Sequence, residues 1–191
     1  MASSDTDDAD GAQRAAARKA ALDELLQWGV DRFSVEGAAQ RCSVGVDFFR
    51  QQWPNERDLI IEALLEYSES TITVPDTGSL LDDLTVLTLS VAAFLNDPMG
   101  RRLLRMLVVD SRSQAVDEET RARFWATRLS TLESIFDHAG ERGELRPNVK
   151  VFIAIQMLMS PLHTYALYTD VEIAPEYCRV VAEMVARAIG R

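Results

Sequence analysis

The stretch that decides the fold runs from Ser34 to Leu65 and reads SVEGAAQRCSVGVDFFRQQWPNERDLIIEALL. Ser34 is a typical N-cap, because its hydroxyl can accept a hydrogen bond from a backbone N–H of the turn that follows. Small and apolar residues then recur at helical spacing as far as Cys42. A break at residues 43–45 precedes a second short helix, Val46 to Gln52. Two short helices joined by such a turn predict a helix-turn-helix.

The helices on either side of this pair are also marked in the sequence. Trp53-Pro54 closes the pair, and Asn55 with Asp58 caps a long third helix that extends to about Glu69. Upstream, residues 11–28 are rich in Ala and Leu at helical spacing, and Gly29 is a predicted C-cap. The helix-turn-helix therefore lies between two longer helices.

The stretch resembles the TetR family of transcriptional regulators, and the match needs no gap from Gly29 to Leu65. The matching positions are Gly29, Ser34-Val35, Ala38-Ala39, Val44, Trp53-Pro54 and Leu59, with Arg14 and Ala20-Ala21-Leu22 upstream. This resemblance implies a ligand-responsive DNA-binding regulator, a repressor that works as a homodimer. Its partners would be a palindromic double-stranded operator and a small-molecule effector.

The sequence departs from the family pattern at the residues that would contact DNA. Ser43 stands in the turn where the family usually has Gly, and Glu56 replaces a usual Lys. Arg50 stands where a Tyr usually contacts phosphate, and Val46-Asp47-Phe48 replaces Lys, a small residue and Thr. These departures leave open an alternative, in which the same fold is a ligand-binding or interaction protein with an eroded DNA-binding head.

Several polar residues of this segment are nevertheless candidates for DNA contact. Arg pairs with guanine and Gln with adenine in the major groove, and a glycine at the helix start lets the backbone approach a phosphate. Basic residues of the first helix would add backbone attraction. The candidate DNA-binding residues are Arg14, Lys19, Ser34, Gly45, Val46, Arg50, Gln51 and Gln52.

Composition and charge narrow the class of protein. The 191 residues carry a formal net charge of −10, which argues against indiscriminate nucleic-acid binding by the whole molecule. Residues 11–57 hold seven basic and six acidic residues, a net of +1, so the negative charge lies elsewhere. No phosphate-binding loop or metal-ligand spacing suggests an enzyme or a cofactor, and no apolar run approaches the roughly 18 residues of a membrane span. A cytoplasmic protein is expected.

The rest of the chain predicts an all-α fold of about nine helices. Residues 1–10 are predicted to be a disordered acidic tail, 11–57 the DNA-binding domain, and 58–191 a ligand-binding and dimerisation domain. Five further helical patterns cover about 79–96, 98–111, 117–139, 148–168 and 175–189, after a break at 71–78. Strand-like alternation is absent.

The last two helices carry more apolar surface than one protomer should bury. The stretch AGERGELRP, 139–147, and the following Ser160-Pro161-Leu162-His163 resemble the C-terminal domain of many TetR-type regulators, in which these helices pair with their copies. The predicted dimer interface comprises Phe152, Val181, Met184 and Val185.

His163 lies in an otherwise apolar helix beside Pro161 and is a candidate for the polar lining of a small-molecule pocket. A hydrogen-bonded core histidine is the alternative. Because Leu, Met, Phe and Val dominate the C-terminal helices, the effector is expected to be largely apolar. The candidate ligand-binding residues are Met106, Asp110, Trp125, Met157, His163 and Tyr165.

Overall fold

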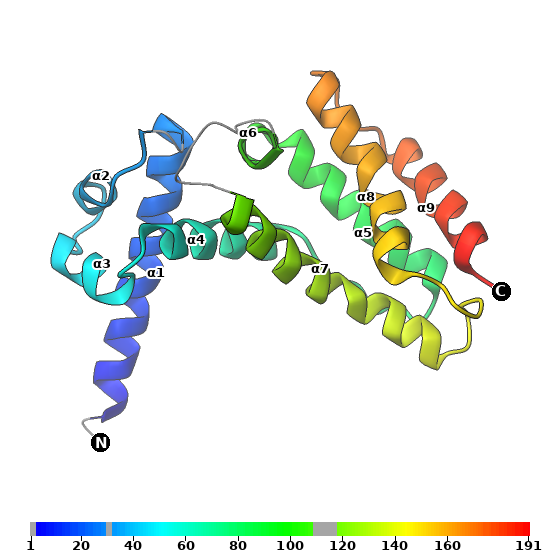
Figure 1. The fold of residues 1–191 in the computed structure, drawn as a ribbon, viewed down its shortest axis with the longest axis horizontal. Helices are drawn as coiled ribbons and strands as arrows, with labels where there is room; N and C mark the ends of the chain where they lie inside the picture. The colour runs from blue at the N-terminus through cyan, green and yellow to red at the C-terminus, as the bar shows by residue number, and fades with distance from the viewer. Residues whose placement is uncertain (1–2, 30–31, 109–117) are drawn as a thin grey trace. The chain divides into compact units, whose positions relative to one another are not determined.

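A computed structural model describes residues 3–29, 32–108 and 118–191, with side chains from Asp10 onward except at 106, 120 and 121. Its regular elements are all α-helices, which confirms the predicted class (Figure 1). They are α1 Ser3–Trp28, α2 Val35–Gln40, α3 Val46–Gln52, α4 Glu56–Thr71, α5 Leu80–Asn96, α6 Pro98–Val108, α7 Glu118–Glu141, α8 Val151–Tyr168 and α9 Pro175–Ile189.

The first helix is longer than the sequence suggests. It begins at Ser3, so the stretch through Asp10 that we expected to be disordered is helical. Aspartates are favourable near a helix N-terminus, where they complement the helix dipole. The other end agrees with expectation, because Gly29 has φ of +76° and donates its backbone N–H to Leu25 O at 2.8 Å.

Contacts divide the chain into two compact units. The N-terminal unit comprises Met1–Tyr67 and Met106–Arg123, and the C-terminal unit comprises Ser68–Arg105 and Phe124–Arg191. The expected boundary after Arg57 assigned α4 from Asp58 onward to the C-terminal part, whereas its residues up to Tyr67 belong to the N-terminal unit. The reason is that Leu59, Ile60, Ala63 and Leu64 of α4 are all buried.

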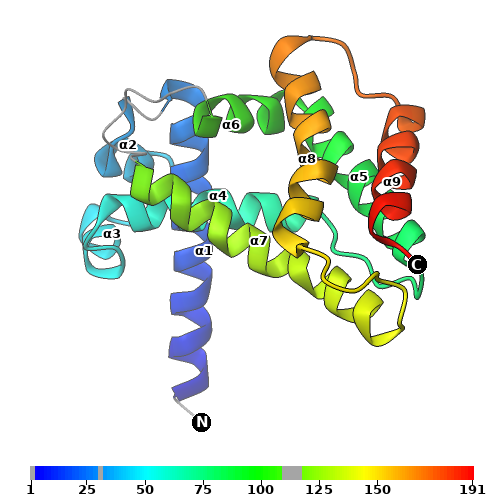
Figure 2. The same ribbon diagram turned by 45° about the vertical axis from the view of Figure 1, so that its right-hand side comes forward.

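The N-terminal unit packs α2 and α3 beside α1 and α4 (Figure 2). Small residues of α1 form its centre, and Ala17 and Ala21 are fully buried. Gly37 of α2 lies so close to the buried Glu24 of α1 that a Cβ there would collide with its carboxylate. Arg41 pairs with the same carboxylate at 2.6 Å. These contacts fix the helix-turn-helix on α1.

The C-terminal unit places α5 against both α8 and α9, which also pack on each other (Figures 1 and 2). Its core is aliphatic, with Leu84, Leu87, Leu158 and Leu162 fully buried. The hydroxyl of the buried Thr88 lies 3.3 Å from Cys178 O, which adds a polar contact between α5 and α9.

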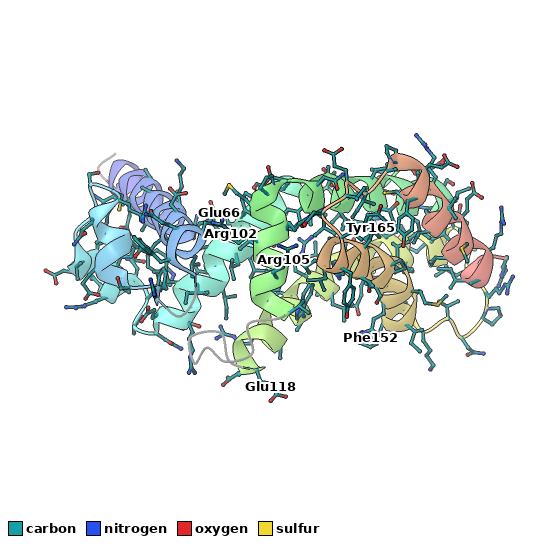
Figure 3. The ribbon with its side chains drawn as sticks, turned by 90° about the horizontal axis from the view of Figure 1, so that it is seen from above. Glu66, Arg102, Arg105, Glu118, Phe152 and Tyr165 are labelled. Carbon is teal, nitrogen blue, oxygen red and sulfur yellow. The ribbon has the colours of Figure 1, made fainter. Side chains whose placement is uncertain are left out.

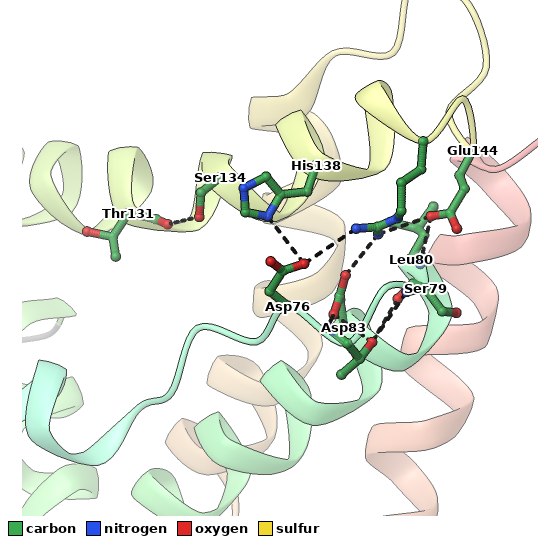
Figure 4. A network of polar contacts seen from close by, with 10 residues as sticks. Asp76, Ser79, Leu80, Asp83, Thr131, Ser134, His138 and Glu144 are labelled. Carbon is green, nitrogen blue, oxygen red and sulfur yellow. Dashed lines mark hydrogen bonds and ion pairs between the residues drawn. The ribbon is translucent and has the colours of Figure 1, made fainter.

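A polar network at the start of α5 explains why the AGERGELRP stretch is so rich in charge (Figure 4). Arg142 contacts the buried Asp83 at 3.0 Å and Glu144 at 3.2 Å, and Glu144 accepts the backbone N–H of Leu80 at 2.8 Å. Arg146 donates to the last carbonyls of α9, Gly190 O and Arg187 O. The stretch therefore joins the ends of α5, α7 and α9.

Candidate functional site

The recognition helix of the helix-turn-helix is α3, which is anchored by Phe49. This ring is buried and lies 6.1 Å from the ring of Trp53. Because Phe49 points inward, the opposite face of α3 presents Asp47, Arg50 and Gln51 to solvent. Gln52 lies on a flank instead, where its amide oxygen accepts from Arg14 at 3.3 Å.

Gly45 is the N-cap of α3 and has φ of −70°, which any residue can adopt. A Cβ at this position would meet no atom within 4 Å. Ser34 is the N-cap of α2, as predicted, and accepts from Gly37 N at 3.0 Å. Val46 is half-buried, and Lys19 of α1 is exposed.

The candidate DNA-binding arginines already have internal carboxylate partners. Arg50 contacts Glu36 at 2.6 Å, and Arg14 contacts both carboxylate oxygens of Glu62 at 2.9 and 3.0 Å. The guanidinium of Arg14 also lies 5.1 Å above the Trp53 ring, a cation–π distance. Arg14 therefore holds α1 to α3 and α4, a structural role that the sequence did not reveal.

Two glutamates, Glu36 and Glu56, add negative charge to the helix-turn-helix region. A hydrogen bond from its own backbone N–H, followed by Arg50, lowers the pKa of Glu36 below its usual value. Burial, with the Glu36 charge second, raises the pKa of Glu56. Both carboxylates would repel a phosphate brought near them, and Glu36 is a functional candidate that sequence reasoning missed.

The candidate ligand-binding residues separate into two places on the C-terminal unit. The ring of Trp125 lies 5.7 Å from His163 and 5.2 Å from Phe124, so α7 meets α8 there. Burial lowers the pKa of His163 to about 4, which makes it a neutral imidazole at neutral pH. Met106 and Asp110 lie outside the described side chains.

Met157 and Tyr165 lie elsewhere, in a groove of about 810 Å³ between α8 and α9. Tyr165 packs on Tyr177 at 5.3 Å between ring centroids, and Tyr177 donates its hydroxyl to Pro161 O at 3.4 Å. In Figure 3, Tyr165 and Phe152 leave α8 on different sides. The structure therefore does not bring all the candidate ligand residues into one pocket.

The predicted dimer residues also separate. Phe152 and Met184 are 52% and 64% exposed, whereas Val181 and Val185 are only 8% and 2% exposed. The two valines are thus core residues of one protomer, and their substitution would test folding rather than assembly. The large exposed apolar residues of α8 and α9 are Phe152, Ile153, Met157, Tyr168, Val180 and Met184.

Among the residues that the structure describes, α8 is the one helix long and apolar enough to cross a membrane by length and composition. Its mean hydropathy is 1.2, and 33% of the window Val151–Tyr168 is buried. A single helix of this kind is weak evidence for a membrane span, because core helices of soluble proteins have the same properties.

The sequence is similar to that of known transcriptional regulators. Residues 74–185 match the model of the tetracyclin repressor-like C-terminal domain. The HTH-type transcriptional regulator AqdR of Rhodococcus erythropolis is 30% identical over 78% of this chain and 72% of its own. The HTH-type regulator YdeS of Bacillus subtilis is 28% identical over 84% of this chain and 81% of its own.

Solved structures agree on the fold. The TetR family transcription regulator SCO0332 superposes with a TM-score of 0.76 at 22% identity, covering 92% of this chain and 97% of that one. TylP, a TetR regulator from Streptomyces fradiae, superposes with a TM-score of 0.71 at 16% identity, over 95% and 88% of the two chains.

Proposed function

This chain belongs to the TetR family of HTH-type transcriptional regulators, a family of DNA-binding proteins rather than enzymes, and from this premise we propose that it is a homodimeric repressor released by a small, largely apolar effector. The observation that carries the proposal is a pair of uncovered surfaces. One is the polar face of α3, and the other is the apolar face of α8 and α9.

The face of α3 supports DNA recognition. Arg50 and Gln51 are the exposed residues there whose side chains can read guanine and adenine edges. Gly45 leaves open space at the start of the helix, into which a phosphate could move close to the backbone. Lys19 adds an exposed positive charge, whereas a DNA contact by Arg14 would have to replace Glu62.

The apolar face of α8 and α9 supports a two-fold dimer. Leaving Met157, Met184 and Ile153 in water is unfavourable by roughly 25 cal/mol per Å² of apolar surface, and a second copy would cover them in an isologous interface. The groove of about 810 Å³ between α8 and α9 would then be filled by the partner. Met157 and Tyr165 belong to that interface in this proposal, and Trp125 and His163 remain the effector candidates.

An effector would act through the continuity of α4. This helix contributes Glu56–Tyr67 to the N-terminal unit and Ser68–Thr71 to the C-terminal unit. A ligand that binds one arrangement of the dimer better than another shifts the equilibrium between them. The ligand and DNA must then change each other's affinity by the same factor.

The proposal is tested by DNA binding of the natural chain and of Gly45→Ala. We expect a palindromic site to be selected from a random library, with half-sites about 34–36 Å apart or at a longer multiple of the helical turn. Gly45→Ala should keep the thermal stability of the natural protein, because its Cβ meets no atom, yet bind the selected site more weakly.

Two observations favour the second candidate function, a regulator-like protein with an eroded DNA-binding head. Asp47 lies on the exposed face of α3, and Arg50 is already paired with Glu36. This alternative would be established if the natural chain and Gly45→Ala both bound the DNA library weakly and without sequence preference.

A further inference from the structure

A single charged residue interrupts the buried stripe of α7. The buried residues of this helix in the C-terminal unit recur at three- and four-residue spacing: Phe124, Arg128, Leu132, Ile135, Phe136 and Ala139. Arg128 is only 6% exposed and lies one turn from the buried Phe124 and one turn from the buried Leu132. The guanidinium therefore extends from the middle of an apolar stripe.

Arg128 has no adequate partner within the part of the chain that the structure describes. Its Nη1 is buried without a hydrogen bond. The charge that favours its protonated form is Glu69, an exposed residue that makes no ion pair with it. Burial is the larger effect and lowers the pKa of Arg128 below its usual value.

Other shielded arginines of the same unit have acceptors for their guanidinium groups, although the Nε of Arg142 is also buried without a hydrogen bond. Arg101 donates to the carbonyls of Leu95, Thr169 and Val171 at 3.0–3.1 Å. Arg142 pairs with Asp83 and Glu144. Arg128 differs from both because no carboxylate or carbonyl of the described residues contacts its guanidinium.

An unpaired buried charge is costly, and no side chain that the structure describes neutralises Arg128, so a ligand is a candidate for its partner. The guanidinium fork matches a planar carboxylate with two parallel hydrogen bonds. We infer that Arg128 is the anchor for the carboxylate of an acidic effector whose apolar body packs against the α7 stripe. This inference rests on the proposed function, since it names the chemical class of the effector.

The surroundings suit such a ligand. Trp125 lies one turn before Arg128 on α7, and its ring packs on His163. Because burial lowers the pKa of His163 to about 4, this residue does not compete with Arg128 as a cation at neutral pH. Phe124 and Leu132 are apolar residues one turn before and one turn after Arg128 on α7.

The test compares matched ligands on matched variants. Straight-chain carboxylates from octanoate to laurate, indole-3-acetate and benzoate are each paired with the corresponding primary amide, and octyl phosphate serves as a second anion. Binding is measured by calorimetry and by thermal shift on the natural chain, Arg128→Met, Arg128→Lys and Arg123→Met. Arg123 is an exposed arginine of α7 that pairs with Asp58 at 2.7 Å, and it serves as the control.

We expect at least one carboxylate to bind the natural chain about tenfold or more tightly than its amide, which corresponds to about 1.4 kcal/mol. Arg128→Met should remove this preference, Arg128→Lys should keep part of it, and Arg123→Met should keep it in full. Octyl phosphate should bind more weakly than the carboxylate of similar length, because the site recognises a planar group.

Three results would overturn the inference. One is that no carboxylate in the series is preferred over its amide by the natural chain. Another is that Arg128→Met retains the preference, and the third is that octyl phosphate binds more tightly than octanoate. If Arg128→Met does not fold, the folded Arg128→Lys variant decides. A reduced or lost preference in that variant supports the anchor, and full retention of the preference refutes it.

The experiments give a different result if the proposed DNA-binding function is wrong and the acidic effector is right. In that case the natural chain would bind carboxylates through Arg128, but band shifts with its selected DNA would show no specific complex. Specific DNA binding without any preference for carboxylates would leave the repressor intact and refute only the acidic effector.

Discussion

At the scale of single residues, arginines of the N-terminal unit are held by the protein's own carboxylates, and two of them, Arg14 and Arg50, are the candidate DNA contacts. Arg50 pairs with Glu36, Arg14 with Glu62, and Arg18 with Glu66 at 2.5 Å. A DNA contact by Arg50 would therefore be an exchange of one anionic partner for another. The contribution of Arg50 to DNA affinity is then the free energy of its contact with a phosphate minus that of its contact with Glu36. This difference is smaller than the contribution that an unpaired arginine would make.

Glu36→Gln should strengthen DNA binding. The substitution releases Arg50 and removes a negative charge next to the phosphates, and surface ion pairs are weak, so we expect an increase of roughly two- to fivefold in affinity at low salt. The increase should shrink as salt is raised. Glu176→Gln, which removes a similar charge from a pair with Arg179, is the control. Equal effects of the two variants in band shifts would contradict a role for Glu36.

His163 should make the protein sensitive to mild acid. Its pKa is about 4 in the folded chain against 6.5 for the free group, so the unfolded chain binds the proton first as pH falls. The unfolding free energy is therefore unaffected by the titration of His163 above pH 6.5 and falls progressively as the pH is lowered toward 4. The loss is at most about 1.4 kcal/mol per pH unit.

The check is urea unfolding of the natural protein, His163→Gln and His138→Gln between about pH 7 and pH 4, the range in which His163 is expected to titrate. The stability of His163→Gln should fall less steeply than that of the other two proteins. Parallel curves for all three would show that His163 is not desolvated in the folded state.

At the scale of helices, the N-terminus of α5 depends on Asp83. This fully buried carboxylate accepts from Thr77 N at 2.6 Å and pairs with Arg142 (Figure 4). Asp83→Leu leaves the N–H of Thr77 without its acceptor, so we expect a loss of roughly 1–3 kcal/mol in unfolding free energy. Asp83→Asn keeps an acceptor and should lose less. The order of the two variants in urea unfolding tests this, and the reverse order would refute it.

The helices themselves were largely predictable from the sequence, because their start and stop signals are local. Ser34 caps α2 and Gly29 ends α1 as expected, and the break at 71–78 lies between α4 and α5. The start of α1 was not predictable. Its low apolar content predicts disorder, whereas its acidic residues also favour a helix N-terminus.

The side-chain partners were less predictable, because they depend on packing between helices distant in sequence. No local signal indicates that Glu62 would bind Arg14, or that Val181 would be buried while Met184 is exposed. Arg128 could have been found, since a charge between Phe124 and Leu132 interrupts the helical period.

At the scale of the molecule, Met157→Asp with Met184→Asp should give folded monomers. Both side chains are exposed in the protomer, so the protomer core does not need them, while two buried charges would prevent assembly. Light scattering gives the mass, and circular dichroism checks the helices. Val86→Asp, at an exposed apolar residue of α5, is the control and should leave a dimer. A dimer of the double variant would place the interface elsewhere.

The division of the chain also limits how regulators of this kind can be recombined. Because α4, α6 and α7 each contribute residues to both units, no single cut separates a complete N-terminal unit from a complete C-terminal unit. A hybrid that takes its operator preference from one parent and its effector response from another needs three junctions, each inside a helix. Every junction must keep the helical register, since an insertion of one residue would rotate the following side chains by about 100°.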